Sequence, residues 1–204
     1  MRQIRRKIVF LDIDGVLQPL EAQERFKNIV RDDNRSACRP EVYEYLEHHF
    51  NIDYRQYHPY DVAAVYYDWD KTAVALLKTV LEYSNAKIVL SSDWRLDRGG
   101  FDRMKAFFAM YGLDKYFIDM TSTYNVIDEV FKEQVESDFK EQNHKNPDLS
   151  YRSVEILEWL NRNPDVKNWV AIDDLRLNGL GNHFVMTKSS MKDEHAVKCL
   201  KILR

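Results

Sequence analysis

The segment Lys7-Ile-Val-Phe-Leu-Asp-Ile-Asp-Gly-Val-Leu17 decides the fold that the sequence predicts. Its four consecutive apolar residues, Ile8 to Leu11, lead directly into Asp12. A short unbroken apolar run of this kind is typical of a strand that is buried on both faces of a parallel sheet. Open α/β sheets bind their ligands at the carboxyl ends of their strands. The segment therefore predicts an α/β fold with a functional site that begins at Asp12.

Two carboxylates, Asp12 and Asp14, stand close together where this strand gives way to a loop. Bringing two carboxylates together costs free energy unless a cation is near. A calcium-binding loop does not fit, because Phe10 would occupy its first position, which needs an oxygen ligand. A turn with two solvated acids is the simpler alternative. The buried strand in front of the pair favours a metal-binding or catalytic role instead.

Composition is that of a single globular domain, or of one domain with a sizeable insertion. The chain has 204 residues, of which 45% are hydrophobic, and this is enough for a substantial core. Its 30 Lys and Arg against 33 Asp and Glu give a net charge of −3, so no global basic field indicates nucleic acid. Cys38 and Cys199 are too few for a disulfide framework or a structural zinc cluster.

Signatures of several other protein classes are missing from the sequence. The first apolar run stops at Asp12, which is too short for a signal peptide, and no stretch is long enough to span a membrane. We therefore expect a cytoplasmic protein. Glycine-rich dinucleotide or P-loop motifs are absent, and no histidines have zinc-ligand spacing.

Apolar runs and helical patterns alternate along the rest of the chain. We expect strands at 8–11, 86–90, 116–120, 169–172 and 183–187. We expect helices at 40–50, 70–81, 101–111, 127–139, 150–161 and from 193 onward. This alternation predicts a three-layer α/β sandwich with a parallel, doubly wound sheet.

Two segments interrupt the alternation within what we treat as a single domain, 1–204. Residues 18–69 form a cap-like insertion after the first strand, and residues 124–148 form a second, smaller helical insertion. The first is rich in Tyr, Trp, Phe and His. Most of these rings are expected to build a local core, and a few to line a pocket where they stack on a substrate base or sugar.

Three of the expected strands end in polar clusters, which are Asp12-x-Asp14, Ser91-Ser92-Asp93 and Asp173-Asp174. In this order, the clusters resemble the haloacid dehalogenase-like (HAD) superfamily, whose members are mostly magnesium-dependent phosphatases and phosphotransferases. The resemblance covers roughly 5–17 and 70–203. The strings at 89–95, 152–156 and 169–174 are most similar to the HAD domain of bacterial RNA-repair (Swiss army knife) proteins.

The resemblance implies roles for the first two clusters. Asp12 matches the nucleophile, which forms an aspartyl-phosphate, and Asp14 matches the general acid and base. Gly15 allows the turn beside the substrate. Ser91 matches the hydroxyl that donates to a phosphoryl oxygen, and Ser92 takes that role if the strand register shifts by one residue.

The resemblance also implies an active-site cation and a metal site. The cation is normally a Lys; Arg152 stands at the matching position, and Lys145 is the alternative. Asp173 and Asp174 match the acidic motif that holds Mg²⁺ together with Asp12 and the backbone carbonyl of Asp14. Asp174 is expected as a direct ligand and Asp173 as a ligand through water.

Two residues after the second strand have less definite roles. Arg95 either contacts a substrate phosphate or caps the edge of the sheet. Trp94 is expected to pack rather than to stack on a base.

Together these features predict a Mg²⁺-dependent HAD-type phosphatase that hydrolyses a phosphomonoester through an aspartyl-phosphate. A nucleotide or nucleic-acid end is one expected substrate, and a small phosphorylated metabolite is another. A phosphotransferase has the same motifs, and a non-catalytic binding module with this fold is the alternative from a different class. No membrane and no obligate protein partner is expected.

Overall fold

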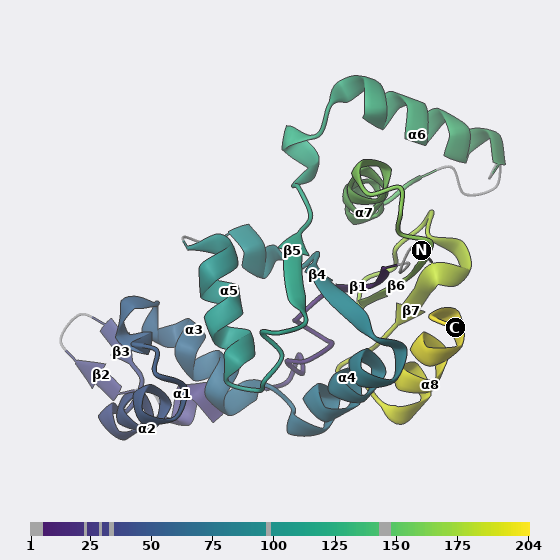
Figure 1. Ribbon diagram of the computed structural model, residues 1–204. Helices are drawn as coiled ribbons and strands as arrows, with labels where there is room; N and C mark the ends of the chain where they lie inside the picture. The colour runs from purple at the N-terminus through teal and green to yellow at the C-terminus, as the bar shows by residue number, and fades with distance from the viewer. Residues whose placement is uncertain (1–5, 23, 29, 33–34, 97–98, 143–147) are drawn as a thin grey trace.

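A five-stranded parallel sheet forms the centre of the computed structural model (Figure 1), which describes residues 6–22, 24–28, 30–32, 35–96, 99–142 and 148–204. The strand order is β5-β4-β1-β6-β7, and every neighbouring pair in it is parallel. The strands are β1 (Lys7–Leu11), β4 (Ala86–Leu90), β5 (Phe117–Met120), β6 (Asn168–Asp173) and β7 (Phe184–Met186). The predicted α/β fold with a parallel doubly wound sheet is confirmed.

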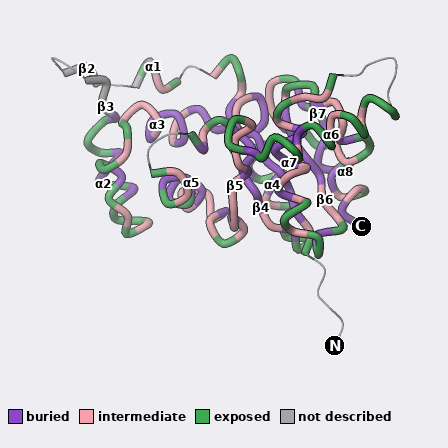
Figure 2. Tube along the Cα trace, turned by 90° about the horizontal axis from the view of Figure 1, so that it is seen from above, coloured by how far each residue is buried: buried purple, intermediate pink, exposed green. Residues whose placement is uncertain are grey.

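The first strand occupies the middle of the sheet because it is apolar on both faces. Val9 and Leu11 belong to the larger buried apolar cluster, and Ile8 and Phe10 belong to the smaller one. Successive strand side chains point to opposite faces, so the two clusters lie on opposite sides of the sheet. Figure 2 shows the buried positions concentrated along the central strands.

Helices cover both faces and complete the three layers. The larger cluster includes α4 (Lys71–Ser84), α5 (Gly100–Ala109) and α8 (Asp193–Ile202), whereas α7 (Tyr151–Arg162) packs on the other face through Ile156 and Trp159. Figure 1 shows α4 and α8 side by side, with α7 on the opposite side of the sheet. The charged helix α6 (Glu129–Gln142) lies outside α7. None of the described helices has the length and apolar character needed to cross a membrane.

Local capping signals fix the start of two helices where the sequence predicts them. Asp70 accepts hydrogen bonds from the backbone N–H groups of Thr72 (2.7 Å) and Ala73 (3.4 Å) at the start of α4. Ser150 accepts from Ser153 N (3.3 Å) at the start of α7. An N-cap oxygen of this kind satisfies a helix donor that otherwise has no partner. This second cap fixes the first turn of α7, which carries Arg152.

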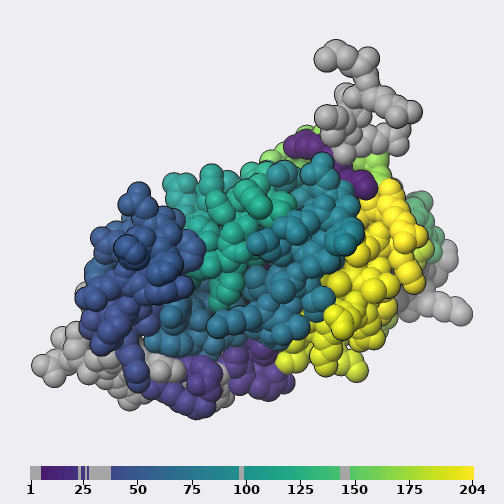
Figure 3. Space-filling model, turned by 60° about the horizontal axis from the view of Figure 1, so that its bottom comes forward, coloured from purple at the N-terminus to yellow at the C-terminus, as the bar shows by residue number. Residues whose placement is uncertain are grey.

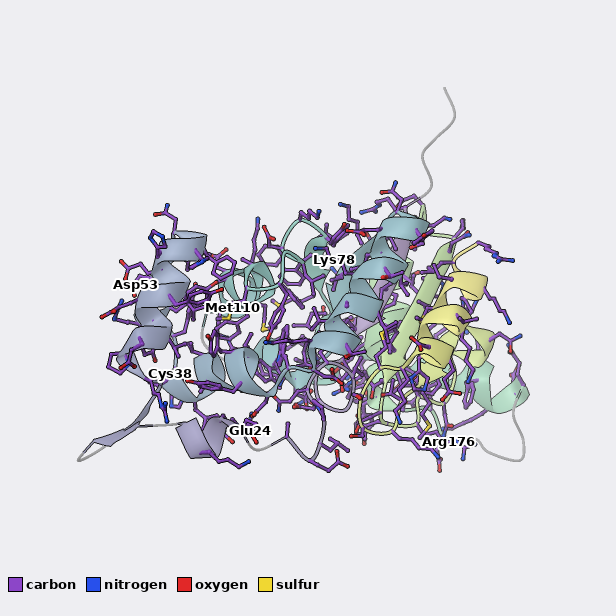
Figure 4. The ribbon with its side chains drawn as sticks, turned by 90° about the horizontal axis from the view of Figure 1, so that it is seen from below. Glu24, Cys38, Asp53, Lys78, Met110 and Arg176 are labelled. Atoms are coloured by element: carbon purple, nitrogen blue, oxygen red, sulfur yellow. The ribbon has the colours of Figure 1, made fainter. Side chains whose placement is uncertain are left out.

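The described residues of the segment 18–69 form several short elements, of which η1 (Tyr54–Gln56) and α3 (Pro59–Ala63) contact α5. The elements are α1 (Glu24–Asn28), the antiparallel pair β2 (Val30–Asp32) and β3 (Arg35–Ala37), α2 (Pro40–Phe50), η1, α3 and η2 (Ala64–Asp68). Tyr54 is buried and donates a hydrogen bond to the Ala106 carbonyl of α5 (2.7 Å). In Figure 3 the blue atoms of the segment lie at one end of the molecule, and Figure 4 labels Cys38 and Asp53 there. The larger apolar cluster continues into this segment through residues such as Leu46 and Val62.

Candidate active site

The three polar clusters meet at one edge of the sheet because β4, β1 and β6 are neighbours. Each cluster begins where its strand ends, and hydrogen bonds tie the strand ends together. The Asp12 N–H donates to the Ile172 carbonyl (3.0 Å), and the Ser91 N–H donates to the Leu11 carbonyl (3.0 Å). Residues that are far apart in sequence therefore face the same small volume.

Three carboxylates gather at this edge. Asp12, Asp173 and Asp174 offer oxygen atoms that all lie within 4.8 Å of one another. Asp12 and Asp173 are buried, and Asp174 is half-buried. All three are hard oxygen donors, which are the ligands that Mg²⁺ prefers. The donor set therefore fits the predicted metal ion.

Arg152 is the cation that the structure brings to these acids. Its Nη1 lies 3.1 Å from Asp12 Oδ1 and 2.8 Å from Asp173 Oδ2, and its Nη2 lies 3.2 Å from Asp93 Oδ1. Burial works against the charge of Arg152, but the charges of Asp12 and Asp173 outweigh it and raise its pKa. The alternative cation, Lys145, lies outside the described residues.

One guanidinium does not fully compensate the two buried acids. Burial and the neighbouring charge of Asp173 raise the pKa of Asp12 to about 7, although Arg152 and a hydrogen bond from the Ser92 side chain act in the opposite direction. Burial also raises the pKa of Asp173. Carboxylates that hold protons this tightly favour an additional positive charge beside them. This electrostatic deficit is a second reason why the site fits a divalent cation.

Asp14 is half-buried, and both of its carboxylate oxygens accept hydrogen bonds. Gln18 Nε2 donates to Oδ1 (2.8 Å), and the Trp94 indole Nε1 donates to Oδ2 (3.0 Å). Burial raises the pKa of Asp14, and the Trp94 hydrogen bond partly offsets this effect. A raised pKa suits a group that must carry a proton and then give it up. Sequence reasoning missed the contact with Trp94; the signal was an indole N–H beside a strand end, which needs an acceptor when it is buried.

The two serines after β4 have different surroundings. The Ser92 side chain hydrogen-bonds the Asp12 carboxylate, whereas the Ser91 carbonyl accepts from Arg95 Nη1 (2.6 Å). Both serines are buried. The Ser92 hydroxyl therefore lies beside the candidate nucleophile, Asp12.

Gly15 is the point of closest approach between the first and third clusters. Its φ is +69°, and a Cβ atom there would lie 2.5 Å from both Cβ and Cγ of Asp174. The Gly15 carbonyl also accepts a hydrogen bond from Thr187 Oγ1 (2.7 Å). A left-handed φ combined with this contact excludes any side chain. Gly15 therefore lets Asp174 approach the Asp12 loop.

Arg95 lies inside the protein just past the end of β4. Its guanidinium is buried and donates to the Ser91 carbonyl and to Glu155 Oε2 (2.6 Å each). Glu155 Oε1 in turn accepts from the Tyr124 N–H (2.8 Å). Arg95 therefore joins the end of β4 to α7 through these two contacts. Glu155 was not singled out by the sequence, since a Glu inside an amphipathic helix carries no distinguishing signal.

Comparison with known proteins adds one family assignment. The family described as the HAD domain in Swiss Army Knife RNA repair proteins matches residues 8–196. A crystal structure of a predicted phosphatase from Clostridium acetobutylicum aligns with a TM-score of 0.31 and 14% identity, covering 84% of this chain and 77% of that chain. No curated protein matches the chain. The matched range of the family contains all three polar clusters and Arg152.

Proposed function

The chain belongs to the family of HAD domains found in Swiss Army Knife RNA repair proteins, which makes it an enzyme of the HAD phosphatase type, and we propose that it is a Mg²⁺-dependent phosphomonoesterase. The observation that carries this proposal is the position of Arg152. This cation bridges Asp12 and Asp173, and Asp174 completes the acidic cluster beside them. Phosphoryl transfer depends mainly on positioning and charge neutralisation, and this arrangement provides both.

In the first half of the reaction, a carboxylate oxygen of Asp12 attacks phosphorus, and the bond from phosphorus to the leaving oxygen breaks. Asp14 gives its proton to that oxygen. In the second half, water attacks the aspartyl-phosphate while Asp14 takes a proton from the water. The bond from phosphorus to Asp12 then breaks, which releases phosphate and restores the carboxylate.

Two further side chains support these steps. Arg152 orients the Asp12 carboxylate and offsets the negative charge that accumulates when a phosphate approaches it. The Ser92 hydroxyl, which faces Asp12, donates to a phosphoryl oxygen. We favour Ser92 for this role because its side chain hydrogen-bonds the Asp12 carboxylate.

For the metal ion, we propose Asp12, Asp174 and the backbone carbonyl of Asp14 as ligands, with Asp173 acting through water. A bound Mg²⁺ supplies charge neutralisation between the nucleophile and the phosphoryl oxygens. The raised pKa of Asp12, which follows from burial and from Asp173, supports a cation at this position.

We propose a nucleotide or a nucleic-acid end as the substrate class. The family description names RNA repair proteins, and this supports a phosphorylated RNA end. The insertion 18–69 supplies Gln18 and Arg25, whose Nη1 lies 3.3 Å from Gln18 Oε1. Through Gln18 the insertion thus reaches Asp14, the acid that protonates the leaving group. We propose that the insertion contacts the leaving group of the substrate.

The test is hydrolysis of an aryl phosphate by the wild type and by Asp12→Asn, with Mg²⁺ and with EDTA. We expect metal-dependent turnover that falls about a thousandfold or more in the variant, because the nucleophile is lost. Asp165→Asn, the same change in an exposed ion pair with Arg6, is the control and should retain turnover. Undiminished turnover in Asp12→Asn, or in EDTA, would contradict the proposal.

A substrate screen follows from the same assay. Nucleotides and RNA oligonucleotides with 3′- or 5′-phosphates are compared with small phosphorylated metabolites. A higher kcat/KM for one of the RNA ends is expected, and a preference for the metabolites would contradict the proposed substrate class while leaving the chemistry intact.

A further inference from the structure

The carboxyl group of Asp14 is held by a separate donor on each oxygen. Gln18 Nε2 binds Oδ1 at 2.8 Å, and Trp94 Nε1 binds Oδ2 at 3.0 Å. A carboxylate has about four lone-pair positions on its two oxygens, so positions for a proton remain after both donors have bound. Donors on different oxygens fix the plane of the group, because rotation about its Cβ–Cγ bond would break both contacts.

Trp94 is itself held rigidly. It belongs to η3 (Asp93–Leu96), and its ring packs edge-on against Trp69 (centroids 6.1 Å apart) and Phe107 (6.2 Å). Its backbone carbonyl accepts a hydrogen bond from the buried guanidinium of Arg103. Arg103 Nη1 also pairs with Asp61 Oδ2 of α3 (2.8 Å). The indole therefore presents its N–H from a fixed position.

The orientation of the Gln18 amide is also determined. Arg25 Nη1, which can only donate, lies 3.3 Å from Gln18 Oε1. This assigns the oxygen to the Arg25 side and the NH₂ group to the Asp14 side. The backbone of Gln18 is tied to the same loop, because its carbonyl accepts from the Gly15 N–H (2.7 Å) and its N–H donates to the Ile13 carbonyl (3.0 Å).

We propose that Trp94 is a positioning residue for the phosphatase reaction, which acts with Gln18 to hold the Asp14 carboxyl in the orientation that delivers its proton to the leaving oxygen. The inference rests on the proposed role of Asp14. Proton transfer depends steeply on the distance and alignment of the two oxygens, so a carboxyl that rotates freely spends little time in the productive geometry. Trp94 makes no contact with the attacking oxygen of Asp12 in this scheme, and its effect is confined to the group that moves the proton.

The protein provides a matched control for this role. Trp69 is buried beside Trp94 in the same aromatic cluster, and within the described part of the chain its Nε1 has no hydrogen-bond partner. Trp69→Phe and Trp94→Phe are therefore the same chemical change in adjoining packed rings. Only the second one removes a hydrogen bond to Asp14.

The experiment measures kcat/KM for two substrates whose leaving groups differ in their need for a proton. An alkyl phosphate requires protonation of its leaving oxygen, whereas 2,4-dinitrophenyl phosphate does not. The ratio kcat/KM reports steps up to formation of the aspartyl-phosphate, so it isolates the proton donation by Asp14 from the later attack of water. Thermal melts of all variants establish that each one is folded.

For Trp94→Phe, we expect kcat/KM to fall about tenfold or more with the alkyl phosphate and by less than about threefold with the dinitrophenyl ester, as a fraction of the 10²–10⁴-fold effect of general acid catalysis. In Trp69→Phe, kcat/KM for each of the two substrates should stay within about twofold of the wild-type value. Equal losses on both substrates, or no loss on either, would overturn the positioning role. If Trp94→Phe does not fold, Gln18→Met is tested instead. It should also lose more kcat/KM with the alkyl phosphate than with the dinitrophenyl ester, and equal losses or no loss in that variant would overturn the positioning role.

Failure of the proposed function gives a different result. Wild-type turnover that survives Asp12→Asn, or no wild-type turnover of either ester, would overturn the mechanism and the role of Trp94 with it. A wild type that depends on Asp12 but is indifferent to Trp94 and Gln18 would overturn the positioning role alone.

Discussion

Single residues in the site are constrained by their neighbours across the sheet edge rather than by their neighbours in sequence. Gly15 has room for no side chain because Asp174 occupies the space where a Cβ would lie. Asp12 is buried between Asp173 and Arg152, and its protonation depends on both. Substitution of Gly15 should therefore change Mg²⁺ binding, and substitution of Asp12 should change the pH dependence of stability. Both effects can be measured separately from a general loss of stability.

Gly15→Ala is expected to abolish activity and Mg²⁺ binding as well as to destabilise the protein. The new methyl group would have to displace Asp174, which lies 2.5 Å from the Cβ position. Gly181→Ala is the matched control, because its φ is +53° and nothing lies within 4 Å of its Cβ position. Both changes cost about 1 kcal/mol of backbone strain, but only the first also disturbs the site. Calorimetric titration with Mg²⁺ distinguishes them, and equal metal affinity in the two variants would contradict the prediction.

Asp12→Asn is expected to stabilise the metal-free protein at high pH. The pKa of Asp12 is raised from an ordinary value of 3.8 to about 7, chiefly by burial and then by Asp173. The folded state therefore binds this proton more tightly than the unfolded state, so the contribution of Asp12 to the free energy of unfolding is greatest below its ordinary pKa of 3.8 and is lost as the pH rises through 7.

Asparagine keeps the shape of the side chain without the charge. In EDTA, the Tm of Asp12→Asn should exceed that of the wild type at pH 8, and the difference should largely disappear near pH 4. Asp165→Asn, whose charge is exposed and paired with Arg6, should show no such gain at pH 8. A wild type that is more stable than Asp12→Asn at pH 8 would mean that the acids are fully compensated without metal.

At the scale of elements, α7 and β4 form a unit that builds one wall of the site. Arg152 and Glu155 are three residues apart, so they project from the same side of α7. Arg152 reaches Asp12, and Glu155 reaches Arg95, which also donates to the Ser91 carbonyl at the end of β4. Through Arg152 the helix thus offsets the negative charge of the acids, and through Glu155 and Arg95 it holds the chain at Ser91.

Glu155→Leu is expected to lower the free energy of unfolding by about 3–5 kcal/mol, because it leaves the buried charge of Arg95 without its partner. Asp165→Leu removes an acid from the exposed pair with Arg6 and should cost less than about 1 kcal/mol. Urea unfolding followed by Trp fluorescence gives both values. Similar small losses in the two variants would show that the Arg95–Glu155 pair is not structurally important.

At the scale of the whole molecule, the segment 18–69 and the sheet share one core. The larger apolar cluster runs from Val9 and Leu90 in the sheet to Leu46 in α2 and Val62 in α3. Hydrogen bonds join the two parts as well, from the Tyr54 hydroxyl to the Ala106 carbonyl and from the Tyr111 hydroxyl to the Val65 carbonyl (2.7 Å each). A shared core of this kind unfolds as one cooperative unit.

The two buried cysteines allow this cooperativity to be measured. Cys38 lies in the segment 18–69 and Cys199 in α8, and both thiols are free. In two variants that each keep one cysteine, the thiol should become reactive towards a labelling reagent at the same urea concentration. Reaction of Cys38 at a clearly lower urea concentration than Cys199 would contradict a single unit and indicate that the segment 18–69 unfolds independently.

The sequence by itself determined the order of strands and helices along the chain and the residues that gather at the carboxyl edge of the sheet. Buried parallel strands require apolar runs on both faces, so the runs ending at Asp12, Ser91 and Asp173 could be recognised locally. Neighbouring parallel strands then bring their carboxyl ends together by geometry. The core of the site follows from these local patterns.

Only the tertiary structure decided how individual side chains are used there. It brought the Ser92 side chain to Asp12, the Arg95 guanidinium to Glu155 and the Trp94 indole to Asp14. Each of these contacts joins residues that lie 60 or more positions apart or depends on the direction of a side chain just past the end of a strand. Neither feature leaves a periodic signal in the chain, because it arises from packing among elements that the sequence specifies separately.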